Sequence, residues 1–588
     1  MQFGDVWEGL IGTLTGCPPD LAERPVSGVV IDSRAVQPGA VFVALHGEKT
    51  DGHLHLRGAF ERGALAAIAE AMALELIPEA TFISEEGAFL RSPSGQESPA
   101  PVVGPFVFLV PSSLRGLQKL ASAWRRKMPA RAIGITGSIG KTTTKETVAN
   151  VLARRFVTLR SEGNLNNEIG LPLTLLRLTP KCQRVVLEMG MYALGEITQL
   201  CELARPQLGI VTNVGPTHLE RLGTIERVAQ AKAELVQALP PADEGGVAIL
   251  NADDPLVLGM ADLTRARVFT YGLNPASDLW ADEPSSDGLE GIRFRLHYGQ
   301  EALILHLPLL GRHSVHTALR SAAAGLVEGL SWSEIITGLQ EVRGQLRLMV
   351  VRGLRETTLI DDTYNASPES MLAALNLLDD ILQKPGQERQ GEPFGEVARP
   401  LRCEVPSPPA CAPQSAPAPL QGAGQAAPGN LGGEATRSIA VLGDMFELGA
   451  YEEEGHRLVG GRAGQILGPA SHRQDKLVTV GQRARWIAEE ALAAGMPMAD
   501  VHVTTTNRDA IAVLQGIMRP GDIILVKGSR AAGMETIVDT LSRPGKRAES
   551  RDLNGEGGAD ADRATSRGVS PCRRSRNGVS GPLQRGNA

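Results

Sequence analysis

The segment GITGSIGKTTTKE, residues 134–146, constrains the fold of this chain more than any other stretch. Apolar residues 132–133 precede it, and the helical pattern TVANVLARRF follows it. The segment therefore predicts a strand, a glycine-rich turn and a helix in succession. A turn of this kind gathers backbone N–H groups at the positive end of a helix dipole, where phosphate groups bind.

Four residues of this turn carry the predicted chemistry. Gly137 and Gly140 let the backbone approach an anion closely. Lys141 can reach the outer phosphates, and the Thr142 hydroxyl can hold a magnesium ion. The spacing is tighter than G-x-x-x-x-G-K-[ST], because Ile135 stands where that pattern has its first glycine. A chance glycine-rich turn is the alternative, and the flanking strand and helix favour nucleotide binding without specifying the reaction.

Composition and charge exclude several classes of protein. A length of 588 residues suggests three or four domains at about 150 residues each. With a net charge of −7, the chain lacks the excess of basic residues that is typical of nucleic-acid-binding proteins. No apolar run approaches the ~18 residues of a membrane span, and the opening MQFGDVWEGLIG lacks the positive region of a secretory signal. The six cysteines have no metal-ligand spacing, which fits a reducing cytoplasm.

The chain divides into three globular blocks and three polar segments. We predict the blocks at about 1–115, 116–310 and 311–542. The polar segments are a loop at 92–104, an insertion at 385–436 within the third block, and a tail at 543–588. The insertion and the tail are expected to be disordered, because their composition provides too few large apolar residues to bury a core.

The second and third blocks alternate apolar runs with helical patterns, which is typical of a parallel α/β sheet. In the first block, LRGAFERGALAAIAEA at 56–71 predicts a helix. The third block is expected to open with the helix VHTALRSAAAGLVEGL at 315–330. The predicted strands of the second and third blocks are AIGIT, RVVLEMG, LGIVTNV, GVAIL, TTLIDD, SIAVLGD, KLVTVG and DIILVKG.

Polar side chains stand where two apolar runs of the second block end. RVVLEMG carries Glu188, and LGIVTNVGPTHLE carries Asn213 and His218. Ligands bind at the carboxyl ends of parallel strands. A carboxylate, an imidazole and the Thr142 hydroxyl beside a phosphate loop suit a magnesium ion. Taken singly, Glu188 can form an ion pair at a strand end, and His218 can be a hydrogen-bonded histidine without a functional role. The position of His218 in a G-P-T-H turn after a strand favours a functional role.

Several phrases together resemble the Mur ligase family of peptidoglycan synthesis. They are GITGSIGKTTTKE, SEGNLNNEIGLPLTLL, LEMGMYALGEI, VTNVGPTHLERLGTIERVAQAKAEL, IDDTYNASPESM, VLGDMFELG and LVKGSRAAGME. IDSRAVQPGAVFVALHGEKTDGHLHL resembles the family's nucleotide-sugar domain. The resemblance covers about residues 25–540 apart from the insertion. NLNNEIG, DDTYNASP and KGSRAAGME are most specific and favour the branch that joins D-alanyl-D-alanine to a UDP-N-acetylmuramoyl-tripeptide.

The resemblance implies an α/β fold of three domains, with a central phosphate-loop parallel sheet and a Rossmann-like C-terminal domain. The first domain would hold the UDP-sugar, the second ATP and Mg2+, and the third the incoming D-alanyl-D-alanine. The tripeptide carboxylate would be phosphorylated by ATP and then attacked by the amine of D-alanyl-D-alanine. The implied protein is a cytoplasmic monomer with no nucleic-acid partner and no stable membrane insertion.

The resemblance also assigns roles to individual residues. Catalytic roles are implied for Lys141, Glu188, His218 and Lys232, and metal contacts for Thr142, Glu188 and His218. ATP contacts are implied for Gly137, Ser138, Gly140, Lys141, Thr142, Thr143, Ser314 and Asp362. Substrate contacts are implied for Ser33, Arg34, Asn164, Asn167, Tyr364, Asn365, Lys527, Ser529 and Arg530. Lys232 falls where the family often has a carbamylated lysine, whereas as a plain lysine on RVAQAKAEL it would be a solvated surface cation.

One motif departs from the family. The family usually has G-R-H-N-x-x-N where this chain has GRHSVHT, so Ser314 and Thr317 replace two asparagines. A hydroxyl lacks the paired donor and acceptor of an amide, which puts the implied adenine contact in doubt.

Two alternatives to this branch remain. One is another amide ligase of the same superfamily, which adds the third amino acid of the peptide or acts on folate. The other is a regulatory nucleotide-binding protein with an inactive site, against which the five residues Lys141, Thr142, Glu188, His218 and Lys232 argue.

Overall fold

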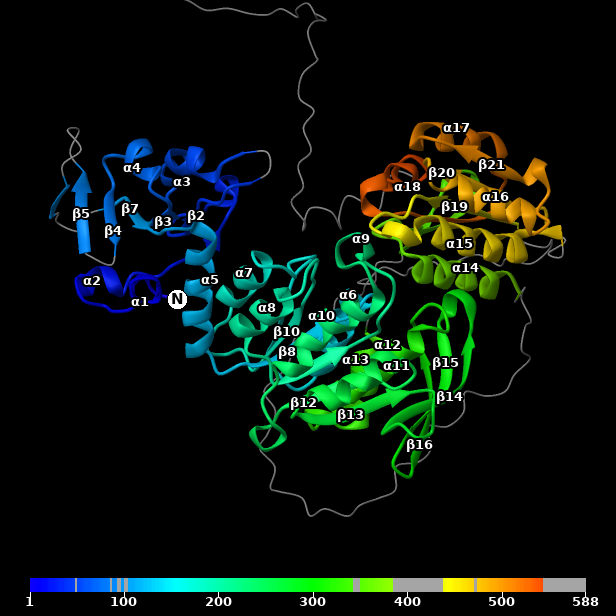
Figure 1. The fold of residues 1–588 in the computed structure, drawn as a ribbon, viewed down its shortest axis with the longest axis horizontal. Helices are drawn as coiled ribbons and strands as arrows, with labels where there is room; N and C mark the ends of the chain where they lie inside the picture. The colour runs from blue at the N-terminus through cyan, green and yellow to red at the C-terminus, as the bar shows by residue number, and fades with distance from the viewer. Residues whose placement is uncertain are drawn as a thin grey trace, which may run out of the picture. The chain divides into compact units, whose positions relative to one another are not determined.

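The structure is a computed structural model that describes residues 1–47, 50–84, 87–91, 97–99, 104–341, 349–383, 437–469 and 473–542. Within these ranges the strands form three sheets, which follow one another along the chain (Figure 1). The predicted insertion 385–436 and the predicted tail 543–588 lie outside the described residues. None of the described helices combines the length and apolar character that crossing a bilayer requires.

The first sheet has the order β1-β2-β3-β7-β4-β5-β6. It is parallel from β1 to β4, and β5 and β6 extend it as antiparallel strands. The strands are β1 (Val29–Val30), β2 (Val41–Val43), β3 (Ala66–Ala69), β4 (Thr81–Ser84), β5 (Gly87–Arg91), β6 (Glu97–Pro99) and β7 (Phe106–Leu109). The helices are α1 (Phe3–Ile11), α2 (Pro19–Ala22), α3 (Leu56–Glu61), α4 (Ala73–Leu76) and α5 (Ser113–Lys127).

Two sequence-based expectations for this first sheet are wrong. The helix predicted at 56–71 ends at Glu61, and Ala66–Ala69 is the buried strand β3 between β2 and β7. Gly63 makes the turn at φ +90°, and burial in the sheet overrides the helix propensity of alanine. The polar loop predicted at 92–104 contains β6, which pairs with β5 through backbone hydrogen bonds that need no apolar side chains.

The central sheet has the order β16-β15-β14-β13-β12-β11-β8-β10-β9. It is parallel from β9 to β14, and β15 and β16 are antiparallel. The strands are β8 (Arg131–Thr136), β9 (Thr158–Arg160), β10 (Arg184–Glu188), β11 (Leu208–Val211), β12 (Val247–Asn251), β13 (Arg267–Gly272), β14 (Leu279–Ser286), β15 (Ile292–Tyr298) and β16 (Glu301–Leu307). The predicted strands AIGIT, RVVLEMG, LGIVTNV and GVAIL are confirmed as β8, β10, β11 and β12.

Eight helices follow strands of this sheet within the described ranges. They are α6 (Lys141–Leu152), α7 (Gly170–Leu176), α8 (Glu196–Ala204), α9 (Leu219–Leu222), α10 (Ile225–Gln237), α11 (Pro255–Leu258), α12 (Ser314–Val327) and α13 (Trp332–Gln340). The helix expected to open the third block, α12, packs on the central sheet instead: Val315 and Leu319 share a buried cluster with Ile133 of β8. The central core therefore extends past residue 311, the predicted start of the third block.

The third sheet has the order β17-β18-β22-β19-β20-β21 and is parallel except for the edge strand β17. The strands are β17 (Met349–Arg352), β18 (Thr358–Asp362), β19 (Ser438–Gly443), β20 (Lys476–Val480), β21 (Val501–Thr504) and β22 (Ile523–Lys527). Both faces are covered by helices, namely α14 (Pro368–Gln383), α15 (Glu452–Leu467), α16 (Arg485–Ala493), α17 (Asn507–Ile517) and α18 (Glu535–Leu541) (Figure 1). This is the Rossmann-like arrangement that was expected, and TTLIDD, SIAVLGD, KLVTVG and DIILVKG are confirmed as β18, β19, β20 and β22.

Candidate active site

The phosphate loop joins β8 to α6, as the sequence predicts. Gly137 has φ +145° and Gly140 has φ +80°, conformations that favour glycine. A Cβ on Gly137 would lie 1.8 Å from the Thr212 hydroxyl of the neighbouring strand end, so no side chain fits there. The loop is held in place by Asn213, whose Oδ1 accepts a hydrogen bond of 2.9 Å from the N–H of Ile139.

Lys141, the first residue of α6, turns back over this loop. Its Nζ donates hydrogen bonds of 2.7 Å to the Gly137 carbonyl and 3.1 Å to the Ser138 carbonyl. The ammonium is thereby held above the glycine-rich turn, beside the N–H groups at the helix start. This places a cation and a helix N-terminus at one point, an arrangement suited to a polyphosphate.

Thr142 and Glu188 lie together at the start of α6 and the end of β10. The Thr142 hydroxyl donates a hydrogen bond of 2.6 Å to Glu188 Oε2. Asn166 Nδ2 donates one of 2.9 Å to Glu188 Oε1. Glu188 is only 1% exposed, so its carboxylate is held at the sheet edge by these two neighbours. A hydroxyl and a carboxylate so placed offer the oxygen ligands that Mg2+ prefers.

His218 follows β11 in a left-handed conformation, with φ +58°. Its Nδ1 lies 2.7 Å from Oε2 of Glu447, which follows β19. Tyr192 packs edge-on against the imidazole, with ring centroids 5.0 Å apart. The hydrogen bond to His218 lowers the pKa of Glu447. Glu447 orients the ring and leaves Nε2 as the nitrogen able to bind a metal, as carboxylates next to metal-binding histidines do.

Lys232 is buried on α10, not a solvated surface cation. It is 2% exposed, and its amine has no hydrogen-bond or ion-pair partner in the described part of the chain. Burial, together with the positive charge of Lys141, lowers the pKa of Lys232 well below its usual range. Lys232 lines the same cavity as the phosphate loop, and its burial disfavours the charged ammonium.

Loops of the third sheet contribute a second group of polar side chains. Lys527, at the end of β22, donates hydrogen bonds of 2.7 Å to Asp362 Oδ2 and 3.0 Å to the Asn365 carbonyl. The guanidinium of Arg530 lies 5.5 Å from the ring centroid of Tyr364. Asp362 was expected near the ATP ribose, and here its carboxylate neutralises the buried Lys527.

Ser529 links the loop after β22 to two further loops of the third sheet. Its hydroxyl accepts a hydrogen bond of 3.0 Å from the Phe446 N–H and lies 3.4 Å from the Ala366 carbonyl. Because Phe446 directly precedes Glu447, Ser529 also supports the residue that orients His218.

One cavity of about 970 Å³ brings the central and third-sheet residues together. It is lined by all the residues predicted for catalysis, for metal and for ATP, and by seven of those predicted for substrate, which are Asn164, Asn167, Tyr364, Asn365, Lys527, Ser529 and Arg530. Thr143 and Ser314 are among them. Asn167 also holds the start of α7, because its Oδ1 accepts a hydrogen bond of 2.9 Å from the Gly170 N–H.

Ser33 and Arg34 do not lie in this cavity. They form a short 3-10 turn in the first sheet region, where Asp32 accepts a hydrogen bond from the Arg34 backbone and pairs with its side chain at 2.8 Å. The Arg34 side chain is 78% exposed. The structure therefore separates the predicted UDP-side residues from the phosphate loop.

The hydroxyls of the two residues that depart from the family motif both form hydrogen bonds within the chain. Ser314 Oγ donates a hydrogen bond of 2.7 Å to the Leu310 carbonyl. Thr317 Oγ1 accepts one of 2.7 Å from Arg320 Nη2. Ser314 therefore keeps only acceptor capacity toward a ligand, which is less than an amide would offer.

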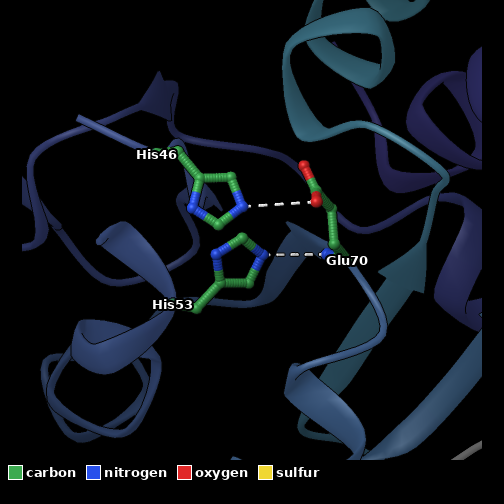
Figure 2. A group of neighbouring side chains, drawn as sticks. All are labelled: His46, His53 and Glu70. Atoms are coloured by element: carbon green, nitrogen blue, oxygen red, sulfur yellow. Dashed lines mark hydrogen bonds and ion pairs between the residues drawn. The ribbon is translucent and has the colours of Figure 1, made fainter. Parts of the chain in front are cut away.

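A separate group of His46, His53 and Glu70 lies in the first sheet region (Figure 2). Its geometry favours a structural role over a metal site. His53 Nε2 accepts a hydrogen bond of 2.9 Å from the Glu70 N–H, and Nδ1 lies 2.6 Å from Asp51 Oδ1. Both ring nitrogens of the buried His53 are thus hydrogen-bonded, and neither is left to bind a cation.

Three residues of the site were missed by sequence reasoning. Asn166 and Glu447 lie inside NLNNEIG and VLGDMFELG, two of the motifs that resemble the family. The resemblance could have drawn attention to these two residues, but it indicates no role for either. Arg320 stands in the run LRSAAAG on α12, where no pattern distinguishes it from a solvated arginine.

Comparisons with known proteins agree with this geometry. Three family models match: "Mur ligase family, catalytic domain" at 25–88, "Mur ligase middle domain" at 135–325 and "Mur ligase, glutamate ligase domain" at 413–530. The UDP-N-acetylmuramoyl-tripeptide–D-alanyl-D-alanine ligase of Mycobacterium tuberculosis is 34% identical over 563 residues, which is 92% of this chain and 96% of that protein.

Two solved structures show the same fold. MurF from Acinetobacter baumannii has a TM-score of 0.65 at 26% identity and covers 88% of this chain and 93% of its own. MurF from Thermotoga maritima in complex with ADP has a TM-score of 0.63 at 23% identity, covering 87% and 96%. The chain belongs to the Mur ligase family, and within it to the MurF branch.

Proposed function

We propose that this chain is an ATP-dependent, ADP-forming ligase that joins D-alanyl-D-alanine to a UDP-N-acetylmuramoyl-tripeptide in peptidoglycan precursor synthesis. The observation that carries the proposal is the joint cavity, in which the phosphate loop, the Thr142–Glu188 pair and the third-sheet loops face one another. The named activity of the Mycobacterium tuberculosis relative, which aligns over nearly its whole length, supplies the substrates.

The phosphate loop and Lys141 bind the phosphates of ATP in this proposal. Thr142, Glu188 and His218 fit a magnesium ion, because they offer a hydroxyl, a carboxylate and an imidazole whose Nδ1 is oriented by Glu447. When bound, magnesium supplies positive charge that offsets the developing negative charge of phosphoryl transfer. Glu188 and its neighbour Asn166 keep the ligand oxygens in place before the metal binds.

Lys232 is proposed to be carbamylated. Its lowered pKa favours the uncharged amine, whose electron pair can attack the carbon of carbon dioxide. One N–C bond forms, a C=O electron pair moves to oxygen, and one proton leaves the nitrogen for water. The product is an anion beside Lys141, where an ammonium would be repelled.

The proposed reaction uses the two sides of the cavity, the phosphate loop and the third-sheet loops. An oxygen of the tripeptide carboxylate attacks the γ-phosphorus, and ADP leaves with the electron pair of the broken P–O bond. The amine of D-alanyl-D-alanine then attacks the acyl carbon, inorganic phosphate leaves, and the amine loses a proton. The acyl phosphate reacts readily with water, so third-sheet loops that exclude water favour the amine.

The remaining assignments complete the proposal. Ser33 and Arg34 in the first domain bind the UDP part, and Asn164 and Asn167 the muramoyl-peptide side. The third-sheet loops that carry Tyr364, Asn365, Lys527, Ser529 and Arg530 face the peptide and D-alanyl-D-alanine, and Ser314 and Asp362 face the nucleoside. We assign the first domain to about 1–115 and place the boundary of the third domain after α13. The protein acts in the cytoplasm, as a monomer, because ATP is available there and one chain lines the whole cavity.

A phosphate-release assay with a panel of substrates tests the proposal. Phosphate is expected only when ATP, a UDP-N-acetylmuramoyl-tripeptide and D-alanyl-D-alanine are all present. Release with a UDP-N-acetylmuramoyl-dipeptide and a free amino acid, or with a folate and glutamate, would instead identify another ligase of the superfamily. No release with any combination, by a folded protein that binds ATP, would favour the regulatory alternative.

A further inference from the structure

Arg320 is a buried cation beside the phosphate loop. It lies on α12, is 5% exposed, and lines the same cavity as Lys141. Its Nη2 donates to Thr317 Oγ1 at 2.7 Å, and the buried Tyr271 side chain interacts electrostatically with the guanidinium. A buried guanidinium normally pairs with a carboxylate, because transfer of an unpaired charge out of water is unfavourable.

No carboxylate takes that place within the described part of the chain. Thr317, which accepts its hydrogen bond, and Tyr271, which lies beside it, are neutral, and its buried Nε has no hydrogen-bond partner among the described residues. No carboxylate among the described residues therefore neutralises the positive charge of the guanidinium. An anion bound in the cavity would neutralise it.

The guanidinium touches the loop where phosphates are expected. A Cβ on Gly140 would lie 2.8 Å from Arg320 Nη2, and Gly140 directly precedes Lys141. The αL conformation of Gly140 favours glycine, and the absence of a side chain there leaves room for the guanidinium. Arg320 thus approaches the start of α6 from the α12 side, whereas Lys141 approaches it from its own helix.

Buried polar groups lie between Arg320 and the loop. The Tyr271 hydroxyl, which interacts electrostatically with Arg320, donates a hydrogen bond of 3.3 Å to the Thr212 carbonyl. Thr212 in turn donates from Oγ1 to the Ile139 carbonyl of the loop at 2.7 Å. The guanidinium is buried and already bonded to Thr317, so little side-chain freedom is lost when it binds a ligand.

We propose that Arg320 is a further nucleotide-binding residue, whose guanidinium contacts the phosphate chain of the bound nucleotide opposite Lys141. The proposal rests on the nucleotide binding proposed above for this cavity. Phosphate oxygens are favoured over the base, because the planar fork of a guanidinium matches two oxygens and its unpaired charge calls for an anion.

The test measures dissociation constants of ADP, ATP and adenosine for the full chain with Arg320→Gln and Arg320→Lys, together with the melting temperature. A hydrogen bond to a charged group contributes about 1.5–3 kcal/mol, so Arg320→Gln is expected to weaken ADP and ATP binding about 10- to 100-fold. Adenosine binding is expected to change less than about twofold. Arg320→Lys is expected to bind ADP and ATP more tightly than Arg320→Gln but less tightly than the unsubstituted chain, because lysine keeps the charge but lacks the planar fork of donors.

Arg154→Gln is the matched control, because Arg154 pairs with Glu341 at the surface beyond α6, at 2.8 Å. It should leave all three constants unchanged. The proposal is overturned if Arg320→Gln binds ADP as tightly as the unsubstituted chain. It is equally overturned if adenosine binding falls as much as ADP binding, which would indicate a base contact or a structural role. If the unsubstituted chain binds no ADP, the proposed function fails and this inference falls with it.

Discussion

The hydroxyl of Thr142 donates a hydrogen bond of 2.6 Å to Oε2 of Glu188, and so joins the first turn of α6 to the end of β10. The bond links two oxygen atoms that both suit magnesium. Asn166 holds the other carboxylate oxygen, so Glu188 is fixed in position from two sides. The site is therefore organised by the protein itself, and little rearrangement is needed when a metal binds.

Removing the charge of Glu188 tests this organisation. Glu188→Gln keeps the size of the side chain but not the anion, so we expect turnover to fall about 100-fold or more and half-maximal activity to require more Mg2+. The measurement is a magnesium titration of phosphate release. Glu341→Gln, at an exposed carboxylate paired with Arg154, is the control and should behave as the unsubstituted chain. An unchanged magnesium dependence of Glu188→Gln would argue against the metal assignment.

Substitution of Lys232 tests the carbamate. Lys232→Arg retains a positive charge and cannot be carbamylated, so ligase activity should be largely lost. Removal of dissolved carbon dioxide should lower the activity of the unsubstituted chain, and added bicarbonate should restore it. Lys127→Arg, at a lysine half exposed beside Asp5 and Glu8, should show neither effect beyond that of the unsubstituted chain. A fully active Lys232→Arg enzyme would refute the carbamate.

His313 predicts an acid sensitivity of the fold. Burial, with the positive charges of Arg320, His316 and Lys527, lowers its pKa from 6.5 to about 4. The folded chain therefore keeps His313 neutral where the unfolded chain protonates it. The stability that this provides is fully present above pH 6.5 and is lost as the pH falls through 4.

Denaturant unfolding without nucleotide measures this effect. Between pH 7.5 and 4.5 the unsubstituted chain should lose about 2–3 kcal/mol more unfolding free energy than His313→Gln, which has no group to titrate there. Equal losses in the two proteins would show that His313 does not stay neutral in the folded state.

Much of the phosphate-loop site was predictable because its signals are local. Strand, glycine turn and helix follow one another in thirteen residues, Glu188 ends an apolar run, and His218 lies in the turn after another. Because β8, β10 and β11 pair in parallel, their carboxyl ends lie side by side at the same end of the sheet, and no knowledge of distant contacts is needed to predict this.

The rest depends on partners far apart in the sequence. Ala66–Ala69 is a strand because β2 and β7 enclose it, although its alanines favour a helix. Glu447 reaches His218 across 229 positions, and Arg320 reaches Gly140 only because α12 packs against α6. Such contacts are set by tertiary packing, which periodicity and composition do not encode.

Transfer of 18O from the substrate tests the proposed acyl phosphate most directly. A UDP-N-acetylmuramoyl-tripeptide labelled with 18O in its terminal carboxylate is incubated with ATP, Mg2+ and D-alanyl-D-alanine, and the released phosphate is analysed by mass spectrometry, with Lys141→Ala as the inactive control. The proposed mechanism predicts one 18O atom in each phosphate, because the carboxylate oxygen that attacks the γ-phosphorus leaves with it. Formation of the ligated product with unlabelled phosphate would contradict it.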